Sequence, residues 1–179
     1  NSVLKLDSFI NEILDYSRNK RMEISAEQFE LKELCEEILD NLKYMDDFST
    51  IQVDLNGIKQ STVQQDKVRL KIILSNLISN AIRFQKRIPG HQSLIKISSE
   101  RDLDITMIHV EDNGEGIRSE HNHKIFEMFF RASDTSKGSG LGLYIAKESA
   151  QKIGAKITLR SVYGKGSTFT VIAPDFNPG

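Results

Sequence analysis

Two strand-like segments near the C-terminal end of the chain are separated by only a few residues. Alternating apolar and polar positions run through residues 156–162 and again through 167–173, with Gly164, Lys165 and Gly166 between them. A connection this short joins antiparallel strands, because a parallel crossover needs a dozen or more residues. The sheet therefore contains at least one antiparallel pair, and the fold is not a doubly wound parallel sheet.

The remaining elements alternate irregularly between helix and strand. Apolar residues every three or four positions predict amphipathic helices, and apolar residues at every second position predict strands. Helices are predicted over 3–18, from Ser25 or just before Leu31 to about Met45, over 68–87 and 141–153, with a short piece near 124–129. Strands are predicted over 51–55, 94–98 and 105–112, with a short extended piece at 22–24 and a turn at Asn56-Gly57. We therefore expect an α/β two-layer sandwich in which helices cover one face of a mixed sheet.

Size and charge narrow the classes of function. The chain has 179 residues, room for one domain and a small appendage, and its net charge of -1 does not favour a nucleic-acid partner. Its one cysteine, Cys35, lies on an apolar helical stripe, so we expect a buried thiol and neither a disulfide nor a cysteine metal site. The sequence contains neither a membrane-spanning run nor a signal peptide. It begins at Asn1 without methionine, and we expect it to be a piece of a longer protein, with upstream targeting or transmembrane segments left open.

Two glycine-rich runs are the most distinctive motifs. The first is DNGEGI at 112–117, and the second is GSGLGL at 138–143. Neither has the G-x-G-x-x-G spacing of a dinucleotide fold, and the GKGS run at 164–167 lacks the spacing of a P-loop and precedes a strand. The glycine loop of eukaryotic-type protein kinases is excluded too, because the VAIK-type strand that follows it is absent.

The first run is suited to contact with a flat base. Asp112 ends a strand whose inward-facing positions include Ile108 and Val110, so its carboxylate should face the layer between sheet and helices. A carboxylate in that layer is costly unless it has a partner, and the amino group of adenine would supply one. Gly114 and Gly116 then let the backbone pass close to the base.

The second run and the helix over 68–87 are suited to phosphate and magnesium. Glycines that precede a helix leave its free N–H groups and dipole available to an anion such as a triphosphate. Asn76 and Asn80 share one helix face, and Arg83 follows on the same side. An amide oxygen, phosphate oxygens and water can complete the octahedral shell of Mg²⁺. Each feature alone is typical of turns or solvated asparagines, but the set in this order points to a magnesium–nucleotide site.

In this order the motifs resemble the C-terminal catalytic half of a two-component sensor histidine kinase. That half has the Bergerat-type ATP-binding fold, which is shared with gyrase-type topoisomerases, MutL mismatch-repair proteins and heat-shock chaperones. The resemblance covers nearly the whole chain. It rests on an asparagine box at 74–84, a D-x-G-x-G box at 112–116, a phenylalanine box at 125–131, a second glycine box at 138–147, and a G-S/T-x-F element at 166–169.

The resemblance implies roles for individual residues. Asp112 would bind the adenine amino group with Gly116 and Thr168 beside it, Asn80 would be the Mg²⁺ ligand, and Asn76 would lie near the phosphates. Arg83 stands where the family usually has lysine and would pair with phosphate, and Phe84 stands where tyrosine is frequent. Residues 118–140 would form a lid over ATP. The other residues that it implies at the nucleotide are Gly114, Ile117, Arg131, Lys137, Gly138, Gly140, Leu141 and Gly142.

Two features of the sequence limit the expected reaction. Relatives that hydrolyse ATP carry a glutamate four residues before the metal-binding asparagine, and this chain has Asn76 there, which cannot activate water. None of the four histidines, at 91, 109, 121 and 123, lies in the H-[ED]-x-x-x-P motif of a phosphoacceptor. We therefore expect no catalytic residue of that kind in this chain, and no self-phosphorylation.

These expectations define a domain plan and a function. Residues 1–20 would be the last helix of an incomplete dimerisation hairpin, 21–175 the catalytic ATP-binding domain, and 176–179 a tail. The protein would be a histidine kinase that positions Mg-ATP for transfer to a hairpin histidine and then to a response-regulator aspartate. Its partners would be that hairpin and the receiver domain, without nucleic acid or direct membrane contact. We expect it in the cytoplasm, with anchoring of the full-length protein in the inner membrane left open.

Two alternatives remain at this stage. One is a degenerate nucleotide-binding module with a sensing or docking role, although all the pocket motifs are present. The other is a relative that hydrolyses ATP or phosphorylates serine in a partner, and Asn76 speaks against it.

Overall fold

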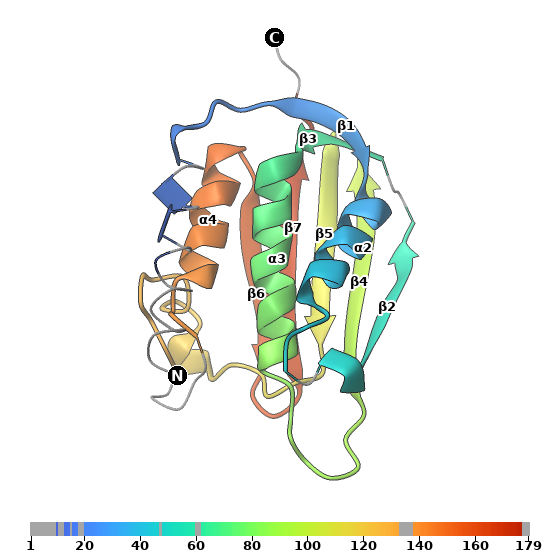
Figure 1. Cartoon of the computed structure of the whole chain (residues 1–179), viewed down its shortest axis with the longest axis vertical. Coiled ribbons are helices and arrows are strands. Elements are labelled where there is room, and N and C mark those ends of the chain that lie inside the picture. Colours follow the sequence, from blue (N-terminus) through green and yellow to red (C-terminus); the bar gives the residue numbers. More distant parts are fainter. Residues whose placement is uncertain are drawn as a thin grey trace.

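In the described part of the chain, helices cover one face of a mixed sheet (Figure 1). A computed structural model describes residues 10, 13–14, 16–17, 20–46, 48–59, 62–132 and 138–176. Within them a five-stranded sheet has the order β2-β4-β5-β7-β6, in which β2 and β4 are parallel and the other neighbours antiparallel. Its strands are β2 (Ile51–Ile58), β4 (Ser93–Asp102), β5 (Ile105–Asp112), β6 (Lys156–Val162) and β7 (Gly166–Pro174). The predicted closing hairpin and the mixed sheet are confirmed.

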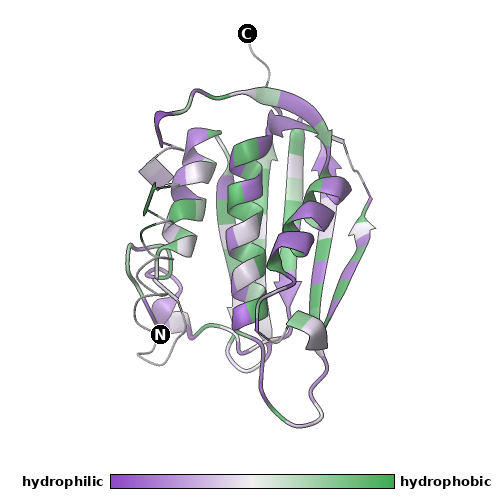
Figure 2. Ribbon diagram, in the orientation of Figure 1, coloured by the Kyte–Doolittle hydropathy of each residue, from purple (hydrophilic) through white to green (hydrophobic). Residues whose placement is uncertain are grey.

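The helices α2 (Leu31–Leu42), α3 (Lys67–Arg83) and α4 (Gly142–Lys152) cover one face of this sheet (Figure 1). Apolar residues at helical spacing on α3 are buried against the inward-facing side chains of β4, β5 and β7. Figure 2 shows hydrophobic residues concentrated on α3 and the strands behind it, whereas the outward surface of α2 is hydrophilic. The predicted two-layer α/β sandwich is therefore confirmed. Cys35 on α2 is fully buried, as predicted, and burial raises the pKa of its thiol to about 12.

A small two-stranded sheet joins the start of α3 to the chain that enters the domain. β1 (Ala26–Glu30) pairs antiparallel with β3 (Thr62–Asp66). Asp66 caps α3 by accepting the Arg69 backbone N–H at 2.9 Å, and its carboxylate also pairs with the buried Arg69 guanidinium. The same guanidinium donates to the carbonyl oxygen of Glu23 at 3.2 Å. The segment before β1 is thus tied to the first turn of the central helix.

Several predicted boundaries are wrong. Asn56-Gly57 is not a turn: both residues lie in β2, where the pairing with β4 shifts register between Asp54 and Gly57. The alternative helix start at Ser25 is wrong, because residues 26–30 form a strand and α2 begins at Leu31. The predicted helical piece at 124–129 is a series of turns after a short 3₁₀ segment, Ser119–His121.

Two helices end earlier than predicted, α2 at Leu42 and α3 at Arg83. For α3 the structure offers a reason. The carbonyl oxygen of Phe84 accepts the Glu115 N–H at 2.9 Å. This hydrogen bond ties the residue after α3 to the loop that follows β5.

The predicted N-terminal helix is described only in part. Residues 1–9, 11–12, 15 and 18–19 lie outside the described residues, and the described positions between 10 and 21 are helical, which includes Lys20 and Arg21 beyond the predicted end. Ile10, Ile13 and Leu14 expose 45%, 41% and 48% of their surfaces, so the need for a partner helix stays a prediction. Within the described part of the chain, no helix is both long and apolar enough to cross a bilayer.

Candidate nucleotide site

A cavity of about 500 Å³ lies between α3, the start of α4 and the loop after β5. It brings together most of the residues predicted for the site, although they come from distant parts of the sequence. The predicted residues that line it are Asn76, Asn80, Arg83, Phe84, Asp112, Gly116, Ile117, Arg131, Gly138, Gly140 and Gly142.

Three predicted residues that the structure describes, Gly114, Leu141 and Thr168, are not part of this lining. Gly114 and Leu141 lie beside it, where Gly114 supports Asp112 and Leu141 is the residue before the first turn of α4. Lys137 lies outside the described residues, as does part of the predicted lid.

Asp112 forms one end of the cavity. It is the last residue of β5, partly buried, and its Oδ1 accepts the Gly114 N–H at 2.9 Å. Burial raises the pKa of this carboxyl to about 6, while hydrogen bonds from the backbone of Gly114 and Ser167 act in the opposite direction. At neutral pH the group is therefore an ionised acceptor that faces the cavity and has been partly stripped of water.

Gly116 sets how closely two loops meet at this end. Its φ of +67° is in the left-handed region, and a Cβ there would lie 2.2 Å from the carbonyl oxygen of Val162. The turn between β6 and β7 therefore packs directly on the loop after β5. A side chain at Gly116 would push the two loops apart and open the wall of the cavity.

Polar side chains of α3 line the middle of the cavity. Asn76 donates through Nδ2 to the Ile72 carbonyl at 2.8 Å, and its Oδ1 lies 2.8 Å from where a Cβ on Gly142 would be. Asn80 accepts a long bond of 3.4 Å from Arg83, whose guanidinium lies within 2.9 Å of the Cβ position at Gly138. The predicted face of α3 thus points at the second glycine run.

The N-terminus of α4 forms the opposite end. The helix begins at Gly142 after Leu141, and no side chain caps it. Ser139 Oγ accepts the N–H of Leu141, at 3.2 Å, from just before the helix. Because the first amides of a helix have no partners within it, this end attracts anions.

The sequence placed Thr168 beside Asp112, but the pairing of β7 with β5 puts Ser167 there instead. β7 pairs with β5 so that Asp112 stands opposite Ser167, and Glu111 stands opposite Thr168. Successive side chains on a strand point to opposite faces, so Ser167 lines the cavity and Thr168 faces away from it. The Ser167 hydroxyl is 2.9 Å from that of Ser161, which accepts the Ile117 N–H at 2.8 Å.

Sequence reasoning missed other lining residues. The hydrophobic ones continue the inward-facing pattern of their elements, and a register argument could have found them together with Ser167. The polar ones on loops gave no local signal. The missed residues are Ser79, Ala81, Glu115, Arg118, His121, Ile125, Phe130, Ala132, Ser139, Leu143, Tyr163, Ser167 and Phe169.

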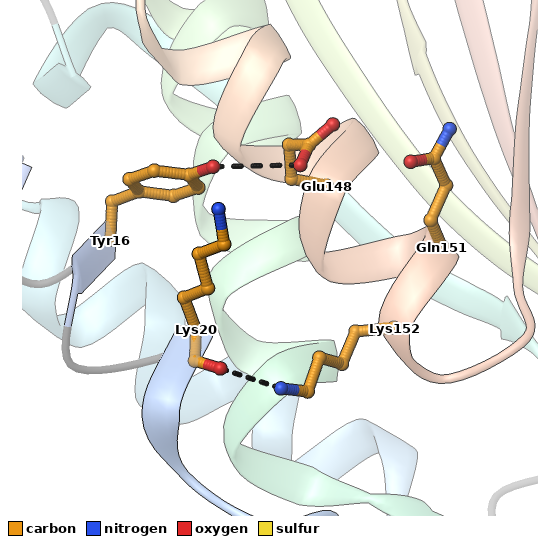
Figure 3. Close-up of a pocket in the computed structure, with 5 residues that line it drawn as sticks. All are labelled: Tyr16, Lys20, Glu148, Gln151 and Lys152. Atoms are coloured by element: carbon orange, nitrogen blue, oxygen red, sulfur yellow. Dashed lines mark hydrogen bonds between the residues drawn. The ribbon is translucent and has the colours of Figure 1, made fainter.

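A second cavity of about 390 Å³ lies on the outer side of α4 (Figure 3). There the Tyr16 hydroxyl donates to Glu148 at 3.5 Å, and the Lys152 ammonium donates to the Lys20 carbonyl at 2.6 Å. None of the predicted site residues that the structure describes lines this cavity. Its contacts join the N-terminal helical residues to α4.

The described residues offer no cluster of three or more acidic, histidine or cysteine side chains for a metal ion. His109 lies on the open face of the sheet, where it contacts Thr170 at 2.9 Å and Glu100 at 3.1 Å. An ion at this site would therefore need ligands other than a protein carboxylate cage.

Comparisons with known proteins agree with this geometry. Residues 65–177 match the family described as histidine kinase-, DNA gyrase B- and HSP90-like ATPase. Cyanobacterial phytochrome B of Nostoc sp. (strain PCC 7120) is 32% identical over 168 residues, which cover 92% of this chain and 22% of the phytochrome. The chain thus spans about a fifth of the length of this relative.

Solved structures give the same result. The Acinetobacter baumannii histidine kinase AdeS superposes with a TM-score of 0.78 at 25% identity, covering 99% of this chain and 82% of that one. Histidine kinase ThkA, solved in complex with the response regulator TrrA, gives a TM-score of 0.75 at 28% identity, covering 98% and 49%. With the family match over residues 65–177, these structures show that the chain belongs to the histidine kinase-, gyrase B- and HSP90-like ATPase family, as a catalytic domain of the sensor histidine kinase type.

Proposed function

We propose that this domain holds Mg-ATP for transfer of the γ-phosphoryl group to a histidine on a separate hairpin. The observation that carries the proposal is the one cavity that joins the Asp112 carboxylate to the uncapped N-terminus of α4. An adenine nucleotide has matching groups at its two ends, an amino donor on the base and an anionic phosphate chain.

The base end favours adenine over guanine. The ionised Asp112 carboxylate would accept a hydrogen bond from the amino group of adenine. Guanine carries a carbonyl oxygen at that position, and two acceptors facing each other in a partly buried site are unfavourable. The loops at Gly116 and Val162 pack closely together, and we propose that a flat base lies against them.

The phosphate end supplies positive charge and backbone donors. Arg83 and Arg131 line the cavity there, together with the first residues of α4. Arg83 is held near Asn80 and Gly138, so its guanidinium is already placed between α3 and the second glycine run. This arrangement would neutralise the phosphate chain and fix its direction.

The described residues fit a magnesium ion that arrives with the nucleotide. Asn80 lines the cavity, and the 3.4 Å hydrogen bond that its amide oxygen accepts from Arg83 is long and therefore weak. Mg²⁺ is usually held by few protein oxygens together with phosphate oxygens and water. When bound it would neutralise charge on the phosphates, and Asn80 would be its ligand from this chain.

The lining favours transfer to a histidine over hydrolysis. Among the described lining residues the carboxylates are Asp112, which ends β5, and Glu115 in the loop that follows, and both lie at the base end. Asn76 lies where the phosphate chain would run, and an amide cannot take a proton from water. The transfer would form a bond between the acceptor's imidazole nitrogen and the γ-phosphorus. The bond to the β–γ bridging oxygen would break, so that ADP leaves.

The partners follow from the same proposal. We assign residues 1–20 to the last helix of a dimerisation hairpin, 21–175 to the catalytic domain and 176–179 to a tail. The acceptor histidine would lie on that hairpin, and the phosphoryl group would pass on to a receiver-domain aspartate. ThkA was solved with a response regulator, which supports a partner of this class. We place the reaction in the cytoplasm, where ATP is available.

Calorimetric titration with a non-hydrolysable ATP analogue and Mg²⁺ tests the nucleotide site. We expect Asp112→Ala to weaken binding at least about ten-fold, since it removes a charge-assisted hydrogen bond. The matched control is Glu111→Ala, which removes an exposed carboxylate from the neighbouring position on the opposite face of β5. Circular dichroism checks that both variants fold. Unchanged affinity in Asp112→Ala, or no binding by the unaltered chain, would contradict the proposal.

A further inference from the structure

Two flat side chains form part of the cavity rim and were not predicted as site residues. The Arg118 guanidinium carbon lies 4.4 Å from the ring centroid of Tyr163, and Arg118 Nη2 donates to the Tyr163 hydroxyl at 3.5 Å. Both residues line the cavity. Tyr163 exposes 58% of its surface and Arg118 is exposed as well, so the pair is accessible to a ligand.

Backbone contacts hold this pair at the Asp112 end. Tyr163 lies in the turn between β6 and β7, and the next residue, Gly164, donates its N–H to the Glu115 carbonyl at 2.7 Å. Ile117, next to Arg118, donates to Ser161 Oγ at 2.8 Å. The pair is therefore attached to the same two loops whose close contact at Gly116 forms the wall beside Asp112.

The position of Arg118 sets it apart from the other arginines of the lining. Arg83 lies against Gly138, next to the second glycine run. Arg118 follows the first glycine run, and its guanidinium lies over an aromatic ring. A planar cation backed by an aromatic ring is suited to the face of a heterocycle, since arginine and tyrosine both stack on nucleobases.

We infer that Arg118 and Tyr163 form a stacking surface for the nucleobase, covering the face of the base whose edge meets Asp112. This inference rests on the proposed nucleotide binding and adds two binding residues to it. The stacking supplies affinity that does not depend on the number of phosphates. Charge pairing with the phosphates would instead grow along the series AMP, ADP and ATP.

Titration of the chain with AMP, ADP and ATP in the presence of Mg²⁺ tests the inference. We expect Arg118→Ala and Tyr163→Ala to weaken binding about ten-fold, by the same factor for all three nucleotides. Arg118→Lys keeps the charge but loses the planar fork, so it should not restore affinity. The control is Lys165→Ala, an exposed residue of the same turn that does not line the cavity, which should bind like the unaltered chain.

Three results would overturn the inference. One is unchanged affinity in both alanine variants. Another is a loss that increases from AMP to ATP, which would make Arg118 a phosphate contact. The third is full rescue by Arg118→Lys, which would show that charge alone matters.

A fluorescence experiment separates this inference from the proposed function. The chain contains no tryptophan, so Tyr163→Trp places a single indole on the proposed surface. We expect the emission of this indole to change when ATP binds, and the change to disappear when Asp112→Ala is added. Binding without any emission change would overturn the stacking surface alone. Failure of the unaltered chain to bind any nucleotide would overturn both.

Discussion

At the scale of single residues, burial of the Asp112 carboxylate lowers the stability of the folded protein but leaves an acceptor for a ligand. Its carboxyl lies at the C-terminal end of β5, and burial raises its pKa from the ordinary 3.8 to about 6. The N–H groups of Gly114 and Ser167 only partly replace the lost water. The ionised form therefore remains under-solvated in the free protein, and a ligand donor would supply the missing hydrogen bond.

This cost predicts a specific dependence of stability on pH. Between about pH 4 and pH 6 the folded state holds a proton on Asp112 that the unfolded state releases, so this group lowers the free energy of unfolding as pH rises. Asp112→Asn keeps the shape and cannot ionise. We expect it to be more stable than the unaltered chain by about 2 kcal/mol at pH 7, with the difference vanishing near pH 4. Urea unfolding across this range measures it, and a variant that is less stable at pH 7 would contradict this account.

Local spacing predicted some residues of the site and not others. Asn76 and Asn80 were found because a helix period places both on one face, and Asp112 because strand parity turns it inward. Thr168 was placed one residue out of register, since its face depends on the pairing of β7 with β5. Arg118 and Tyr163 could not be paired from sequence, because two loops distant in the chain bring them together.

At the scale of elements, α3 both supports the site and anchors the chain that enters the domain. One face is buried on the sheet, and Asn76 and Asn80 line the cavity. At its first turn, Arg69 is buried with Asp66 and donates to the carbonyl oxygens of the segment before β1. A buried charge pair of this kind is costly when one partner is removed.

A double-mutant cycle tests the anchor. We expect Arg69→Met to lower the free energy of unfolding by about 3 kcal/mol or more, because Asp66 would be left buried without its counter-charge. Asp66→Asn retains an oxygen for the cap but also breaks the pair. The double variant should be destabilised by clearly less than the sum of the two single changes in urea unfolding. Strict additivity would show that the two side chains do not act together.

Helices and strands were predictable where their apolar pattern repeated over many residues. The helix over α3 and the hairpin of β6 and β7 were found because their patterns repeat over several turns or pleats. β3 was missed because its sequence, TVQQD, is largely polar and its strand forms only by pairing with β1. Asn56-Gly57 has the composition of a turn, yet parallel pairing with β4 keeps it within β2.

At the scale of the whole molecule, α4 links two regions that lie far apart in sequence. Its first residues line the nucleotide cavity, and further along Glu148 and Lys152 contact Tyr16 and Lys20 (Figure 3). The same helix therefore meets the expected phosphate position and the N-terminal helical residues. Under the proposed function, α4 would contact both the bound nucleotide and the segment that we assign to the hairpin.

The most direct test of this account is phosphoryl transfer in trans. The chain would be mixed with Mg²⁺, ATP labelled at the γ-phosphate, and the histidine-bearing hairpin proposed as its partner. Asn80→Ala and a hairpin without its histidine would serve as controls. We predict acid-labile label on the hairpin histidine and none on the chain itself, with the label lost in both controls. Release of free phosphate as the main product, or label on this chain, would contradict the central claim that the domain positions ATP for a histidine outside itself.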